Sequence, residues 1–157
     1  MSHPGLILRI IALAAGFTLS AASSAGAAPA PNPCGILTPH TLAASFHGAV
    51  PASHLTSRHE RGKTFKTCTW RQGKASLSVT TGPSYVLGGF GGPPSMIVTK
   101  PVHGLGPHSI YSHDDNPQFQ FADVLFMRSP FSGDVHTNGN LPFVDILALA
   151  RDVYRAE

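Results

Sequence analysis

The segment FKTCTWRQGKASLSVTT, residues 65–81, decides the fold of this chain. It contains two runs of strand-forming residues, 65–71 and 75–81, separated by the loop Gln-Gly-Lys. In the second run apolar residues alternate with Ser and Thr, and this period of two around a short glycine-containing loop is typical of a β-hairpin. Cys68 and Trp70 are two residues apart, so they lie on one face of their strand. The segment predicts an antiparallel hairpin whose cysteine and single tryptophan point together into the core.

Three more strands are expected after the hairpin, at residues 96–99, 108–112 and 118–127. On the longest of them, Asp123 shares a face with Phe119 and Phe121, while the apolar residues 122, 124 and 126 form the other face. Asp123 is thus the one acid within an apolar strand. Burial would raise the pKa of its carboxyl, whereas an edge-strand position would explain the charge as protection against aggregation.

A helix is expected on each side of these strands. Thr38 followed by Pro39 is typical of a helix start, Leu42 and Phe46 mark a buried face, and Gly48 can end the helix. A final helix can begin at Asn140 and Pro142, with one apolar stripe formed by Phe143, Ile146, Leu147, Ala150, Val153 and Tyr154. We therefore expect an α+β fold, an antiparallel sheet of about five strands with both helices packed on one face.

The first 27 residues resemble a secretory signal peptide. Arg9 precedes the apolar run 10–19, which is too short to span a bilayer, and Ala25-Gly26-Ala27 offers a cleavage site. Residues 28–33, rich in Pro and Ala, are expected to form a flexible tether, and residues 34–157 a single domain. The sequence thus predicts a protein secreted or delivered to the periplasm or cell envelope, without a transmembrane segment in its mature form.

Cys34 and Cys68 are the only cysteines. In an exported chain two thiols normally become a disulfide, and closing a loop of about 35 residues would stabilise the fold by roughly 3–4 kcal/mol in the chain-entropy model. The alternative, a catalytic or metal-binding thiol, is weaker because neither cysteine lies in a C-x-x-C motif. A disulfide between Cys34 and Cys68 is the prediction.

The composition excludes several classes of protein. Of the 157 residues 42% are apolar and 12% are charged, which does not fit a disordered charged tail or a coiled coil. Basic residues concentrate in one part of the chain: residues 58–100 hold seven Lys or Arg and one acid, whereas residues 101–157 hold three and seven. A basic surface attracts anionic polymers or lipid head groups, which makes Arg58, Arg61 and Lys63 candidate ligand contacts. Phe90 is a further candidate, because it lies in a glycine-rich loop outside any apolar periodicity and can be an exposed contact point.

Histidine is the most unusual feature of the composition, with nine residues. His103, His108 and His113 follow one another at steps of five, and a folded-back loop would be needed to gather them around zinc or copper. No nucleophile elbow, H-E-x-x-H motif or phosphate loop is present, so no catalytic residue and no cofactor is assigned.

Several short motifs resemble those of a known family. They are Pro33-Cys34-Gly35-Ile36-Leu37-Thr38 before a helix, Cys68-Thr69-Trp70 on a strand, Gly104-Leu105-Gly106 before another, and Leu147-Ala148-Leu149-Ala150-Arg151 in the last helix. Together they look like a family of small exported proteins and lipoproteins, many of them actinobacterial, that is classed as a domain of unknown function. The resemblance implies an envelope or secreted location and the disulfide, although this chain lacks the lipidated cysteine of many members.

Three interpretations of function follow. The leading one is a non-catalytic, monomeric binding module that meets an unknown partner at the cell envelope or outside the cell. The second is a histidine-rich metal-binding protein that uses His103, His108 and His113, and the third is an unrecognised hydrolase. Nucleic acid is not an expected partner, because basic and aromatic residues do not alternate on one strand face.

Overall fold

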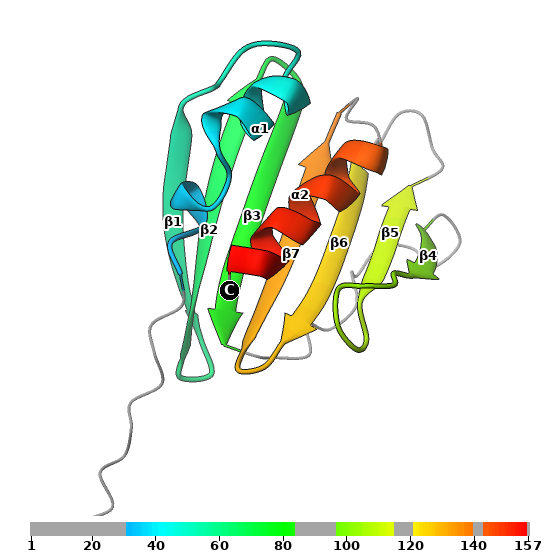
Figure 1. Cartoon of the computed structure of the whole chain (residues 1–157). Coiled ribbons are helices and arrows are strands. Elements are labelled where there is room, and N and C mark those ends of the chain that lie inside the picture. Colours follow the sequence, from blue (N-terminus) through cyan, green and yellow to red (C-terminus); the bar gives the residue numbers. More distant parts are fainter. Residues whose placement is uncertain (1–30, 84–96, 115–120, 140–142, 157) are drawn as a thin grey trace, which may run out of the picture.

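A computed structural model describes residues 31–83, 97–114, 121–139 and 143–156. These residues form one antiparallel sheet with helices on one side (Figure 1). The strands, given in chain order, are β1 (Ser53–Glu60), β2 (Lys63–Gln72), β3 (Ala75–Pro83), β4 (Ile97–Pro101), β5 (Ile110–Asp114), β6 (Phe121–Arg128) and β7 (Phe131–Asn138). They lie side by side in the order β1-β2-β3-β7-β6-β5-β4.

The helical elements are the 3-10 turn η1 (Pro33–Gly35), α1 (Pro39–Ser45) and α2 (Phe143–Ala156). The expected start of α1 is confirmed, because the Thr38 hydroxyl accepts a hydrogen bond from the Thr41 N–H at 3.1 Å and Pro39 occupies the first turn. Beyond α1, Gly48 has a φ of 100°, a backbone conformation that glycine adopts without strain.

The expectation of about five strands is wrong, because the sheet has seven. The two that the sequence did not reveal are β1 and β7. Seven of the eight residues of β1 are exposed, so neither face of this strand carries the apolar alternation that marks a half-buried strand. The buried residues of β7 are Ser132, Gly133, Val135 and Thr137, and Val135 is the single large apolar side chain among them. Phe131 begins β7 and is half-buried.

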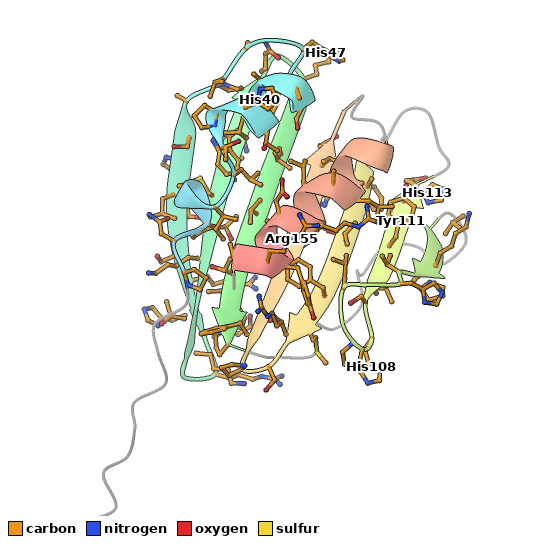
Figure 2. All side chains as sticks on the ribbon, in the orientation of Figure 1. His40, His47, His108, Tyr111, His113 and Arg155 are labelled. Carbon is orange, nitrogen blue, oxygen red and sulfur yellow. A yellow bond between two sulfur atoms is a disulfide. The ribbon has the colours of Figure 1, made fainter. Side chains whose placement is uncertain are left out.

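Both helices cover the same face of the sheet, as predicted (Figure 1). Cys68 and Trp70 point into the core beneath them, with exposed fractions of 0% and 2%, and Phe126 of β6 is equally buried. Tyr111 from β5 joins this core beside α2 (Figure 2). The predicted α+β class and the shared direction of Cys68 and Trp70 are therefore confirmed.

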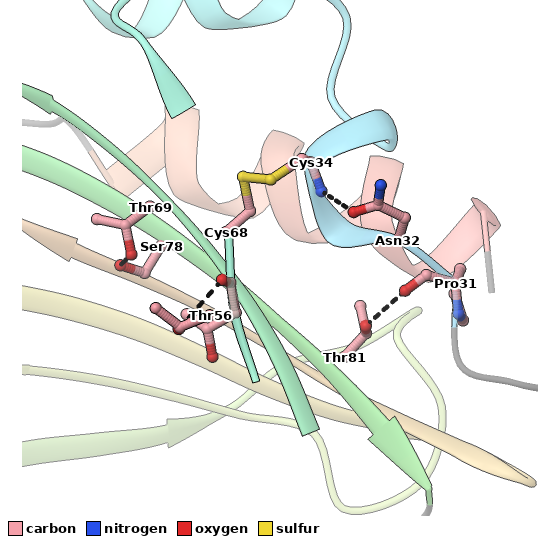
Figure 3. The surroundings of a disulfide bond; sticks show 9 residues. Pro31, Asn32, Cys34, Thr56, Cys68, Thr69, Ser78 and Thr81 are labelled. Atoms are coloured by element: carbon pink, nitrogen blue, oxygen red, sulfur yellow. Dashed lines mark hydrogen bonds between the residues drawn. A yellow bond between two sulfur atoms is a disulfide. The ribbon is translucent and has the colours of Figure 1, made fainter. Parts of the chain in front are cut away.

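The predicted disulfide is present and joins η1 to β2 (Figure 3). Cys34 and Cys68 lie with their Cα atoms 5.1 Å apart, and the Cys34 N–H donates to Oδ1 of Asn32 at 3.1 Å. Pro31 lies three residues before Cys34, and its carbonyl accepts a hydrogen bond from the Thr81 hydroxyl at 2.8 Å. Residues 31–33, assigned to the tether on the sequence, are thus bonded to the domain.

Some predicted features lie outside the described residues, namely the signal segment 1–27, Phe90 with its glycine-rich loop, Phe119, and Asn140 and Pro142 at the start of the last helix. Within the described ranges no helix is both long and apolar enough to cross a membrane.

Candidate functional site

The face of the sheet opposite the helices carries a row of polar residues across its whole width. Strand register places seven residues in one row across all seven strands, because directly paired residues share a face. We call this side of the sheet the polar face. Its central row, in strand order, is His54, Thr69, Ser78, His136, Asp123, Ser112 and Thr99.

Hydroxyl pairs link neighbouring strands on the polar face. Thr69 and Ser78 have their side-chain oxygens 3.0 Å apart, as Figure 3 shows, and the same distance separates those of Thr67 and Thr80 in the next row. These bonds satisfy polar side chains that a sheet face would otherwise leave to water. They also hold the hydroxyls in fixed positions, which favours recognition of a polar ligand.

A surface hollow of about 540 Å³ opens on the polar face over β1 and β2. It is lined by the start of β1 and the end of β2, through Ala52, His54, Thr56, Thr69 and Arg71. Arg71 is exposed and forms no ion pair with any other described residue. A guanidinium beside an imidazole and two hydroxyls is a donor-rich set, which suits a carboxylate or phosphate group.

Two of the basic residues singled out in the sequence also lie on the polar face. Arg58 pairs with Phe65 in the register, and Lys63 precedes Phe65 by two residues on the same strand. Arg58 Nη2 lies 3.2 Å from Glu60 Oε2, and the guanidinium carbon lies 5.8 Å from the centre of the Phe65 ring. Arg61 is in the adjoining turn with a φ of 49°. The structure therefore gathers these three cations at the β1–β2 turn, at the opposite end of β1 from the hollow.

A second polar group lies on β6 and β7, where Asp123 and Asp134 are close together beside His136. The Asp123 side chain is fully buried, and its Oδ1 lies 3.5 Å from Nδ1 of His136, which is 37% exposed. His136 in turn stacks on the Phe121 ring, with the two ring centres 5.9 Å apart. Among the described residues, neither oxygen of Asp123 accepts a hydrogen bond from an N–H or hydroxyl donor.

Burial changes the titration of all three groups. It raises the pKa of Asp123 to about 6, and it raises the pKa of Asp134 well above its ordinary value, where the nearby Asp123 charge adds to the effect. The contact between the two carboxyl groups opposes the rise in the pKa of Asp123 and adds to the rise in the pKa of Asp134. Burial lowers the pKa of His136, and the neighbouring Asp134 offsets part of this decrease. Of the two explanations of Asp123 offered by the sequence, the structure supports burial, because β6 lies between β7 and β5 and not at an edge of the sheet.

Asp123 is poorly placed to act as a catalytic acid. A catalytic acid must reach the atom that it protonates, whereas the Asp123 side chain has no exposed surface. His136 is half-buried and, unlike Asp123, has part of its side chain at the surface. The two aspartates contribute to the fold and to its dependence on pH.

The histidines proposed as metal ligands do not form a site. Figure 2 shows His108 and His113 apart, and His113 stacks on Tyr111 with the ring centres 5.0 Å apart. His103 and His108 are exposed in the segment between β4 and β5. Across the described parts of the chain, no three His, Cys, Asp or Glu side chains come close enough together to hold a metal ion.

Sequence reasoning missed four of the residues that line the hollow, His54, Thr56, Thr69 and Arg71. Thr69 and Arg71 were on an expected strand, and their alternation with Cys68 and Trp70 already placed them on the face away from the core. His54 and Thr56 lie on β1, which carries no apolar pattern, so no signal placed them there.

Comparison with known proteins identifies no relative. No protein-family model, curated protein or solved structure matches the chain.

Proposed function

We propose that this chain is an exported, non-catalytic binding module whose ligand is an anionic polymer of the cell envelope. The observation that carries the proposal is the open hollow beside Arg71 on the polar face, over β1 and over β2, the strand with the most Lys and Arg. Residues 53–74 hold six Lys or Arg and a single acid, Glu60, which is already paired with Arg58. Such an excess of positive charge attracts and retains carboxylated or phosphorylated chains.

The length of the basic surface favours a polymer over a small ion. Lys63 and Arg71 lie on the same face of β2 and are eight residues apart, which is about 27 Å at ~3.4 Å per residue. Arg58 lies between them in the direction of the strands. One phosphate ion contacts a single cation at a time, whereas an extended chain reaches all three.

Export is supported by the amino-terminal sequence and by the disulfide. The apolar run and the small-residue segment at residues 10–27 are typical of a signal peptide. The bond between Cys34 and Cys68 is typical of proteins that mature in an oxidising compartment. The likeness of several motifs to those of small exported proteins points the same way.

Binding of long-chain polyphosphate and of poly-L-glutamate to the disulfide-bonded protein tests this function. Arg71→Gln should weaken binding of these chains about threefold to tenfold, as expected for loss of one partly solvated ionic contact. Binding should also weaken as salt is raised, because added ions screen exposed charges.

Arg155→Gln is the matched control, since Arg155 is an exposed arginine on α2 and faces away from the polar face (Figure 2). Inorganic phosphate and phosphatidylglycerol vesicles complete the comparison. Equal binding by the two variants, or stronger binding to vesicles than to either polymer, would contradict the proposal.

A further inference from the structure

The outer edge of β1 is the longest unpaired strand edge in the described part of the sheet. The strand order leaves β1 with β2 as its single neighbour, and in Figure 1 no described element runs along its other side. Seven of its eight residues are exposed, including Leu55 at 44%. An edge of this kind presents a row of unpaired N–H and C=O groups that can add another strand.

We propose that the occupant of this edge is β1 of a second copy of the chain, paired antiparallel across a two-fold axis. Such an axis is perpendicular to the sheet, so each pair of opposed residues must come from the same face. This restricts the pairing to registers centred on one residue that faces its own copy. The candidate registers are those centred on Thr56, Ser57 or Arg58, which lie near the middle of β1.

Charge selects one of these registers. Centring on Arg58 places that arginine opposite the partner's Arg58, and like charges directly opposed across strands are destabilising. Centring on Thr56 places Glu60 opposite Ala52 of the partner subunit, which offers the carboxylate no hydrogen-bond partner. Centring on Ser57 instead places His54 opposite Glu60 of the partner subunit and Thr56 opposite the partner's Arg58. The edge is therefore complementary to itself in the register in which Ser57 meets the partner's Ser57.

This register completes the proposed binding surface, and in this respect the inference rests on the proposed function. Within one copy, the hollow and the cations of the β1–β2 turn lie at opposite ends of β1. In the antiparallel pair, Ala52 at the hollow lies opposite Gly62 of the partner subunit. The partner's Arg61 and the partner's Lys63 therefore come beside the hollow. Each dimer then has two composite sites, and a bound polyanion offsets the repulsion between their cations.

Ser57→Cys tests the register directly. In the proposed dimer the two cysteines face each other, with their Cα atoms about 4.5–5.5 Å apart, within the range that a disulfide spans. We expect this variant to form a covalent dimer on mild oxidation, in the absence of any polyanion. Ser53→Cys is the matched control, because residue 53 is equally exposed on the same strand yet would lie about 27 Å from its copy.

Sedimentation of the native protein over a range of concentrations provides the second measurement. Self-association should be detected, and Ser57→Lys should abolish it by placing two ammonium groups on the axis. Equal cross-linking of the two cysteine variants, or a native protein that stays monomeric at millimolar concentration, would overturn the dimer. Because both measurements omit the polymer, a dimer that forms while Arg71→Gln leaves polymer binding unchanged would refute the proposed function alone.

Discussion

Asp123 shows how a single residue can link burial to pH. Its carboxyl has no exposed surface and a pKa of about 6, against an ordinary value of 3.8. The folded chain therefore holds this proton more tightly than the unfolded chain does. Protonation stabilises the fold at low pH, and this contribution is lost as the pH rises from about 4 through 6. Asp134 acts in the same direction, whereas the lowered pKa of His136 costs stability below about pH 6.5.

Asp123→Asn should stabilise the protein at pH 8, where the wild-type carboxyl is buried and charged. We expect the free energy of unfolding at pH 8 to rise by about 1–3 kcal/mol, and the gain to shrink toward pH 4. Denaturant unfolding at both pH values measures the change. Asp152→Asn, at a half-exposed position of α2, is the control. A variant that is no more stable than wild type at pH 8 would show that the buried charge carries no such cost.

The sequence allowed a prediction for Asp123 but not for the two side chains that tune it. Asp123 could be placed because its strand alternates apolar residues clearly. Asp134 and His136 lie on β7, which has too few apolar residues to be recognised as a strand. Their proximity to Asp123 depends on the pairing of β6 with β7, a contact that no local pattern specifies.

At the scale of elements, the sheet is held together partly by aromatic rings that lie over glycines. Phe126 of β6 covers Gly133 of β7 on the helix side, and Phe65 of β2 covers Gly82 of β3 on the polar face. A Cβ on Gly133 would lie 2.2 Å from Cζ of Phe126, and a Cβ on Gly82 would lie 2.3 Å from Cδ1 of Phe65. Glycine therefore allows each ring to lie close against the neighbouring strand. Because Gly133 stands where an apolar side chain would mark a buried strand, β7 was not recognised in the sequence.

Gly133→Ala should destabilise the protein by about 1–3 kcal/mol, because the fully buried Phe126 ring has little room to move away. Thermal unfolding followed by circular dichroism is a suitable measurement. Gly35→Ala is the matched control, since no atom lies within 4 Å of a Cβ at that position, and it should change stability little. Equal effects of the two substitutions would mean that the ring does not constrain the strand.

At the scale of the whole molecule, the disulfide connects the amino-terminal turn to the second strand of the sheet. It could be predicted from the cysteine count and the expectation of export, and both helices and their common side could be predicted as well. The hollow on the polar face could not be, because it depends on β1 pairing with β2, and β1 is exposed on both of its faces. Apolar alternation in a sequence reveals strands that pack on a core, but it does not reveal a strand such as β1 that is exposed on both faces.

Replacing both Cys34 and Cys68 with Ser should lower the free energy of unfolding by about 2–4 kcal/mol, as expected for opening a loop of 34 residues. Denaturant unfolding of the double variant beside the native protein measures the loss. Reduction of the native protein should reproduce it, and full retention of stability in either case would contradict this role of the bond.

The strand order has a consequence for how the chain folds. Residues 53–83 and residues 97–138 each form an antiparallel meander from strands that follow one another in the sequence, and β3 and β7 alone join the two. Each meander closes through short loops, whereas the seam pairs residues such as Gly82 and Ser132, which are 50 positions apart. Loop closure over such a distance is entropically costly, so we expect pairing along this seam to be slower than formation of either meander.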